Sequence, residues 1–361
     1  MYTQLDRLGV RQDIFTPLRK HSNRNNNQID FTVPGSAVRF SGVLSAYHRI
    51  FFKQKIRTLY RDLETFGVAG DCDLVHATTL FSDGALAYEL FRKYGKPYIV
   101  SVRNTDINMF LKYKPHLIFL ARRILDNAAR LVFISQSNLD NFFQHPLVAM
   151  FALRYWSKAL VINNGIEQLW LQNLHPARRS CAKRILFIGR FDRNKNAVRL
   201  IQAFLALRAS RPELRLSLVG GAGPHEEKVR QLAMRHGECI MYHGPVAPGP
   251  ELIGICRASD MFAMASHHET FGLVYVEALS QGLPVLFTRG QGIDGTFSGN
   301  VGVAVDPASV ADIRRGLEQM IDNYAGFDTS QICFDNFDWE RIAARYLDLY
   351  HAILSPPSAF R

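Results

Sequence analysis

The sequence contains no long hydrophobic run. None of its 361 residues lies in an uninterrupted apolar stretch of about 18, the length that a membrane-spanning helix needs. The first residues, from Met1 to Asp6, lack a charged region followed by an apolar core, so we do not expect a secretion signal. The composition, 47% apolar and 21% charged, is that of a globular protein, and the length allows two domains of ordinary size.

Cysteine is scarce and scattered. Five are present and no two of them form a Cys-x-x-Cys pair. This spacing predicts neither a zinc site nor a disulfide framework, and a reducing cytoplasm is the simplest setting. The five are Cys72, Cys181, Cys239, Cys256 and Cys333.

Acidic residues are few in the first half of the chain. Residues 1–165 hold 22 Lys/Arg against 12 Asp/Glu, whereas the remainder holds 21 against 20. Such a bias favours an anionic partner surface, either nucleic acid or phospholipid headgroups. We favour lipid, because no nucleic-acid module is visible and the run from Arg49 to Arg61 mixes cations with large apolar groups, as interfacial helices do. An ordinary surface helix that packs Phe51, Ile56 and Leu59 inward explains this run equally well.

Short apolar runs alternate with helical patterns along the whole chain. This alternation predicts parallel sheets with crossover helices, and its two series predict an α/β protein with two doubly wound, Rossmann-like domains. The first series of expected strands is 13–17, 29–33, 74–77, 97–102, 131–134 and 160–162. The second is 184–188, 215–219, 240–243, 261–263 and 285–288, with helices expected at 84–94, 197–209, 226–236 and 251–257.

Polar residues and a proline interrupt the pattern after Gly165. We therefore expect an N-terminal domain at 1–165 and a C-terminal domain at 166–334. Residues 335–361 form a closing amphipathic helix and tail, with Asp338 as a plausible N-cap.

The most informative stretch runs from His267 to Leu279. It sets Glu269 in a loop and Glu277 on an otherwise apolar helix that stops before Gly282. A buried carboxylate is costly unless it meets a hydrogen-bond donor, and a bare helix N-terminus attracts anions. The pattern therefore fits a ligand that carries both hydroxyls and phosphate. The plain alternative is an N-cap region followed by a solvent-facing Glu.

Two further loops are expected at the carboxyl ends of strands, where doubly wound sheets bind ligands. The loop from Gly189 to Asn196 carries Arg190 and Lys195, which are suited to neutralising a diphosphate. The loop from Gly220 to Pro224 is rich in glycine, which permits close backbone approach. Each loop alone is weak evidence.

Taken together, these motifs resemble the retaining nucleotide-sugar glycosyltransferases of family 4, which have the GT-B fold, with two Rossmann-like domains facing across a cleft. The resemblance rests on Gly189-Arg190 with Lys195, the glycine loop at 221–223, the Glu269-x7-Glu277 spacing, residues 162–166 and Trp339. The segments 80–84, 102–106 and 290–295 look like the branch that builds bacterial surface polysaccharides.

The resemblance implies roles for individual residues. Arg190 and Lys195 would hold the diphosphate, Glu277 the ribose hydroxyls and Glu269 the transferred sugar, with Gly189 beside them. The backbone around Phe271, Gly272 and Leu273 would meet sugar and phosphate. A glycosidase-type carboxylate pair is the obvious rival, but a hydrolase needs no Arg/Lys cradle.

Two departures from the family pattern stand out. Many relatives carry a His where this chain reads 103–106, so Asp106 becomes the candidate for contacting acceptor or donor sugar, with Arg103 as a phosphate or structural partner. Capping of the following helix explains Asp106 equally well. The chain also begins within the helix that usually follows the family's first strand, so we expect that the first strand is missing.

The resemblance thus implies a hexosyltransferase that moves a sugar from a UDP- or GDP-linked donor to a lipid-linked or oligosaccharide acceptor. It implies no other cofactor, and a position in the cytoplasm on the inner face of the membrane, held there by the basic N-terminal domain. We expect no metal site, because Asp71-Cys72-Asp73 precedes its strand and so lies at the wrong end of the sheet. A catalytically impaired donor-binding or scaffold protein, an epimerase and a nucleic-acid binder are the alternatives.

Overall fold

The computed structural model describes residues 1–20, 28–175 and 181–355. The chain forms two compact units. Unit 1 comprises Met1–Ile134, Asn141–Ile162 and Trp339–Arg361, and unit 2 comprises Ser135–Asp140 and Asn163–Asp338. The closing helix α15 (Trp339–Leu354) is thus part of unit 1.

Unit 1 is built on a four-stranded parallel sheet of order β3-β4-β5-β6. Its strands are β3 (Val75–Ala77), β4 (Tyr98–Val102), β5 (Arg130–Phe133) and β6 (Ala159–Val161). The connecting helices are α4 (Ser82–Tyr94), η2 (Asp106–Leu111), η3 (Pro115–Leu117), α5 (Ile118–Asn127), α7 (Pro146–Ala149) and α8 (Ala152–Trp156). Helix α6 (Gln136–Gln144) is divided, because its residues up to Asp140 group with unit 2. Every residue of β4 is buried, as expected of a central strand whose two faces are both covered.

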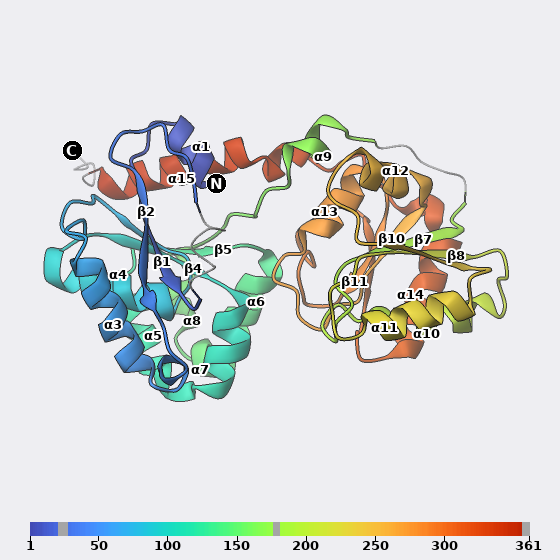
Figure 1. Cartoon of the computed structure of the whole chain (residues 1–361), viewed down its shortest axis with the longest axis horizontal. Helices are drawn as coiled ribbons and strands as arrows, with labels where there is room; N and C mark the ends of the chain where they lie inside the picture. The colour runs from blue at the N-terminus through green and yellow to red at the C-terminus, as the bar shows by residue number, and fades with distance from the viewer. Residues whose placement is uncertain (21–27, 176–180, 356–361) are drawn as a thin grey trace. The chain divides into compact units, whose positions relative to one another are not determined.

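The two ends of the chain meet in unit 1. Helix α1 (Tyr2–Arg7) packs against α15, and Leu5, Ile342 and Tyr346 join Ile99 of β4 in one apolar cluster (Figure 1). This burial explains the amphipathic pattern of the closing helix.

A second, separate sheet in unit 1 pairs β1 (Asp13–Leu18) with β2 (Ala37–Val43) in parallel. Helices α2 (Tyr47–Ile50) and α3 (Phe52–Glu64) follow it, and α3 buries Phe52, Ile56 and Leu59. The alternative interpretation of the run from Arg49 to Arg61, an ordinary surface helix with its apolar side chains packed inward, thus holds for α3 itself. Phe51, which that alternative also placed inward, remains 49% exposed.

The predicted strand at 29–33 is wrong. Residues 28–31 have no regular structure, and the Asp6 carboxylate accepts hydrogen bonds from the backbone N–H groups of Thr32 and Val33. Because these donors are satisfied by a side chain, no strand ladder is needed there. The strand lies instead at β2, where half-exposed residues and Gly42 weaken the sequence pattern.

Unit 2 is a doubly wound domain with a six-stranded parallel sheet of order β12-β11-β10-β7-β8-β9. Its strands are β7 (Arg184–Ile188), β8 (Arg215–Val219), β9 (Ile240–Gly244), β10 (Met261–Ala263), β11 (Val285–Thr288) and β12 (Gly302–Val305). The sequence pattern located the first five, but not β12. Figure 1 shows α12 (Pro250–Ala258) and α13 (Leu273–Ser280) on one face of this sheet and α10 (Ala197–Arg208), α11 (Glu226–Arg235) and α14 (Val310–Asp322) on the other.

Shorter helices complete unit 2, namely α9 (Gln168–Gln172), η4 (Tyr324–Gly326) and η5 (Phe334–Phe337). Helix α13 stops as the sequence predicted, because Gly282 follows its C-cap with a φ of +75° and Pro284 leads into β11. Two Rossmann-like domains, the predicted fold class, are thus present.

Candidate functional site

Two loops of unit 2 pack backbone against backbone at the carboxyl ends of β7 and β8. Gly220 has a φ of +140°, and a Cβ placed there would lie 1.8 Å from the carbonyl oxygen of Gly189. A Cβ on Gly223 would lie 2.3 Å from the carbonyl oxygen of Phe191. Both positions therefore require glycine, and they hold the glycine loop against the loop that carries Arg190 and Lys195.

A third loop is tied to the same place by Asn194. Its side chain accepts a hydrogen bond from the His268 N–H and donates one to the His268 carbonyl, each 2.9 Å long. Its carbonyl oxygen accepts from the N–H of His267 at 2.8 Å. These bonds place Glu269, the next residue, beside the loop after β7.

Lys195 and Glu269 meet as an ion pair. The Lys195 Nζ lies 2.5 Å from Glu269 Oε2, and the two side chains are 24% and 13% exposed. The Lys195 N–H also donates to Asp192 Oδ1 at 2.8 Å, which fixes the backbone that presents the ammonium group. A bound anion would compete with Glu269 for this cation, and the carboxylate would then be free to accept from a hydroxyl.

Arg190 is held less tightly. Its side chain is 68% exposed and its Nε lies 3.9 Å from Asp192 Oδ2, at the limit of an ion pair. The guanidinium is therefore available to a ligand, although no contact in the described parts of the chain joins it to Lys195.

Helix α13 presents an uncapped N-terminus. Its N-cap is Gly272, with a φ of +81° and no side-chain cap. A Cβ at Gly272 would lie 2.5 Å from the Tyr275 ring, so this position also requires glycine. Phe271 is buried and its ring stacks on Phe337 with centroids 5.9 Å apart, so its side chain is not available to a ligand and its backbone is left to meet one.

Glu277 lies further along α13. Burial raises the pKa of its carboxyl group to about 7, and the nearby negative charge of Glu167 adds to the rise. Within the described ranges no residue hydrogen-bonds this carboxylate. A half-buried carboxylate without a donor is costly, and sugar hydroxyls would supply the missing donors.

In unit 1 the structure corrects the interpretation of Asp106 as a sugar-contacting residue. Its side chain is 0% exposed, and its carboxylate accepts hydrogen bonds from the backbone N–H groups of Leu80, Phe81 and Arg103 at 2.9 to 3.2 Å. Burial raises the pKa of this carboxyl group to about 6. Asp106 therefore joins the loops after β3 and β4, and its bond from the Arg103 N–H also caps the start of the helix that follows, as the alternative interpretation proposed.

Arg103 stays half-buried at the carboxyl end of β4, where its Nε donates to the carbonyl of Thr78 at 3.2 Å. Unit 1 also holds a buried cation that the sequence did not reveal. Lys55 of α3 is buried, its Nζ donates to Ser82 Oγ at 2.7 Å, and burial lowers its pKa despite the charge of Asp83. The polar Ser82-Asp83 pair in an apolar segment was the only sequence feature that could have indicated a buried cation here.

The Asp71-Cys72-Asp73 segment precedes β3, and Asp71 Oδ2 accepts from Arg11 at 2.7 Å. No group of three or more potential metal ligands occurs within residues 1–20, 28–175 and 181–355. The same part of the chain contains no helix long and apolar enough to span a membrane.

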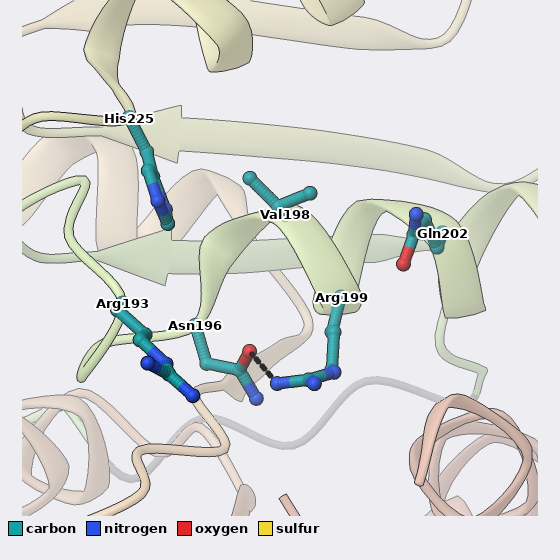
Figure 2. Close-up of a pocket in the computed structure, with 6 residues that line it drawn as sticks. All are labelled: Arg193, Asn196, Val198, Arg199, Gln202 and His225. Atoms are coloured by element: carbon teal, nitrogen blue, oxygen red, sulfur yellow. Dashed lines mark hydrogen bonds between the residues drawn. The ribbon is translucent and has the colours of Figure 1, made fainter. Parts of the chain in front are cut away.

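A cavity of about 330 Å³ lies beside the first turns of α10 (Figure 2). It is lined by Arg193, Asn196, Val198, Arg199, Gln202 and His225. Arg199 Nη1 donates to Nε2 of His267 at 2.9 Å, and burial together with the charge of Arg199 lowers the pKa of that imidazole. None of the residues predicted to bind a donor lines this cavity.

Comparison with known proteins finds two families that match successive parts of the chain. The family described as Glycosyltransferase Family 4 matches residues 1–167, and Glycosyl transferases group 1 matches residues 176–336. A D-inositol 3-phosphate glycosyltransferase of Pseudarthrobacter chlorophenolicus is 30% identical over 309 residues, 78% of this chain and 71% of the relative. Another, from an Arthrobacter species, is 34% identical over 177 residues, 46% of this chain and 42% of the relative.

Solved structures show the same fold. Sucrose-phosphate synthase from Thermosynechococcus elongatus superposes with a TM-score of 0.70 at 18% identity, covering 97% of this chain and 91% of that one. HepE from Anabaena, solved in complex with UDP, gives a TM-score of 0.67 at 16% identity, covering 94% and 100%. The chain therefore belongs to the glycosyltransferases, with a Family 4 N-terminal half and a group 1 C-terminal half in a GT-B fold.

Proposed function

We propose that this protein is a retaining hexosyltransferase that moves a sugar from a nucleotide diphosphate sugar to a lipid-linked or oligosaccharide acceptor in bacterial surface polysaccharide synthesis. The observation that carries the donor half of this proposal is the Lys195–Glu269 pair in the loops around the uncapped N-terminus of α13. A cation, free N–H groups and an exchangeable carboxylate are what a diphosphate sugar needs.

In this proposal Lys195, Arg190 and the α13 N-terminus bind the diphosphate. Glu277 accepts hydrogen bonds from the ribose hydroxyls, and Glu269, released from Lys195, accepts from the hydroxyls of the transferred sugar. The loop backbone at Gly189 lies against the glycine loop and lets the phosphates approach closely.

The transfer step breaks the bond between the anomeric carbon and the diphosphate oxygen, and the electron pair leaves with the diphosphate. The acceptor oxygen bonds to the same face of the anomeric carbon, and its proton passes to the departing diphosphate oxygen. Fixed cations and N–H groups stabilise the negative charge that develops on the leaving group, so the barrier falls. No enzyme nucleophile takes part, and the configuration is retained.

UDP is the first nucleotide to test, because HepE was solved with it, and GDP is the second. We propose no metal or further cofactor for the step. One observation supports an acceptor at an anionic membrane, namely the excess of Lys/Arg in residues 1–165. The names of the two relatives offer D-inositol 3-phosphate as an alternative acceptor.

A donor-binding protein that does not transfer is the second candidate. The observation that favours it is that β1 and β2 form a sheet of their own, so that β3 is an edge strand of the four-stranded sheet. Loops that follow an edge strand are supported from one side only and would position an acceptor poorly.

The test is incubation of the protein with radiolabelled UDP- and GDP-hexoses and a membrane lipid extract, or with D-inositol 3-phosphate. Transfer to a lipid-extractable product with retained anomeric configuration supports the proposal. Nucleotide binding without transfer to any acceptor favours the second candidate, and inverted configuration contradicts the mechanism.

A further inference from the structure

The large hydrophobic side chains on the surface are unevenly distributed. Sixteen are exposed in the described part of the chain, and thirteen of these belong to unit 1. Nine of the thirteen fall in three segments, residues 45–57, 107–125 and 146–158. The most prominent are Leu153 (93% exposed), Met150 (84%), Ile50 (74%), Phe119 (70%), Tyr113 (68%) and Trp156 (52%).

The same three segments contain no acidic residue. They hold ten Lys/Arg and not one Asp or Glu, although the whole chain has 32 acidic residues. Two of the ten cations are committed to the fold, because Lys55 is buried and Lys158 donates to three backbone carbonyls. Of the remaining eight, Arg154 forms an ion pair with Asp126, just outside the second segment, at 3.2 Å, and the others stand among the exposed apolar groups without a carboxylate in these segments to neutralise them.

Two contacts join the three segments into one surface of unit 1. Lys114 Nζ donates to the carbonyl of Arg49 at 2.7 Å, which links the second segment to the first. The Arg122 guanidinium lies 5.3 Å from the centre of the Phe151 ring, which links the second to the third. Helices α5, α7 and α8 lie together in unit 1 in Figure 1. We name the whole, residues 45–57, 107–125 and 146–158, the acid-free surface.

We propose that the acid-free surface is where the protein docks on an anionic lipid bilayer, with its aliphatic and aromatic tips inserted at the headgroup boundary. The proposal deepens the membrane association in the proposed function and rests on it. Single exposed apolar residues are ordinary, but a group of them among an excess of cations matches an interface that is apolar inside and negatively charged outside.

The composition favours lipid over nucleic acid. Nucleic acids bind cations through their phosphates and aromatic rings through base stacking. Ile50, Met150 and Leu153 have neither charge nor ring, so they would not contribute to binding a nucleic acid. Trp156 and Tyr113 have apolar rings with a polar edge, the type that collects at the headgroup level.

The test is flotation of the full-length protein with vesicles of phosphatidylcholine alone or of phosphatidylcholine mixed with phosphatidylglycerol. We expect binding only to the anionic vesicles. The pair Met150→Ser with Leu153→Ser, and separately the pair Lys112→Glu with Arg123→Glu, should each reduce the bound fraction on the order of tenfold. All four side chains are exposed, so these variants should fold.

The matched controls lie on α11 of unit 2. Met234 is 76% exposed and Arg235 is exposed, so Met234→Ser and Arg235→Glu change the same chemistry outside the acid-free surface and should leave flotation unchanged. Trp156 supplies an internal probe, because vesicles should shift the tryptophan emission to the blue in the native protein and not in Trp156→Phe.

UDP titration of the same variants separates this inference from the proposed function. Intact UDP binding together with indifference to anionic vesicles overturns the docking surface and leaves the donor site standing. Vesicle binding without UDP binding supports the docking surface and contradicts the donor site. Three other results also overturn the docking surface. The unit 2 controls could lose flotation equally, or the protein could prefer RNA over vesicles. The native protein could also be a dimer that does not bind vesicles and that the Met150/Leu153 pair converts to a monomer.

Discussion

The two units use the loops at the carboxyl ends of their strands differently. In unit 2, Arg190, Lys195 and Glu269 are held by neighbouring loops but remain 68%, 24% and 13% exposed. In unit 1, Asp106 is 0% exposed and all its hydrogen bonds go to backbone N–H groups. A charged residue in a loop of a doubly wound domain can therefore either remain available to a ligand or hold neighbouring loops together by accepting their backbone hydrogen bonds. The exposed fraction of its side chain distinguishes the two roles.

The largest effect should come from Lys195→Ala. Because Lys195 would face the charge that develops on the leaving diphosphate, its removal should lower transfer on the order of a hundredfold or more. Initial rates with a labelled donor measure this. Arg193→Ala is the matched control, since Arg193 is an exposed cation of the same loop and should leave the rate within about twofold.

Asp106→Ala should mainly destabilise the protein. It leaves three buried N–H groups without an acceptor, and each such group costs about 1 kcal/mol or more, so we expect a loss of about 3 kcal/mol. Urea unfolding measures the loss. Asp73→Ala, which removes an exposed carboxylate from the same unit, should stay within about 0.5 kcal/mol, and an equal cost for both variants would contradict the structural role.

Glu277→Gln should change the pH dependence of stability. The pKa of Glu277 is raised from 4.5 to about 7 in the folded state, so the native protein binds more protons than the unfolded chain in that window. Stability from this group therefore falls as pH rises from about 4.5 to 7, by at most about 1.4 kcal/mol per pH unit. The variant should lack this decline in thermal unfolding between those pH values, and an unchanged profile would place the titration elsewhere.

Arg103→Ala should have the smallest effect. Arg103 is half-buried and donates to a single carbonyl, so its loss should reduce stability by about 1 kcal/mol. Steady-state kinetics should show a higher KM for the acceptor and an unchanged KM for the donor. A change in the donor KM instead would show that unit 1 contributes to donor binding.

The sequence predicted unit 2 well because its signals are local. Strands such as β7 and β11 are buried apolar runs that end at glycine or charge, and α13 is closed by Gly282 and Pro284. The loops that carry Lys195 and Glu269 follow from those strand ends, so the proximity of the two residues could be expected.

Unit 1 was harder because its determinants act over long distances. The segment at 29–33 is apolar at both ends, yet Asp6, more than twenty positions earlier, supplies the acceptor for its N–H groups. Asp106 likewise finds two of its donors some 25 residues away, at Leu80 and Phe81. The buried Lys55 depends on the packing of α3 on α4, which no local pattern reveals.

The most direct test of the central claim is calorimetric titration of UDP, and then GDP, into the native protein, Lys195→Ala, Glu277→Ala and Arg103→Ala, without added metal. If the donor site is built from unit 2, the native protein and Arg103→Ala bind one of the two nucleotides equally well. Lys195→Ala and Glu277→Ala then bind it at least about tenfold more weakly. Native affinity in both unit 2 variants, or loss of binding in Arg103→Ala alone, would contradict the account.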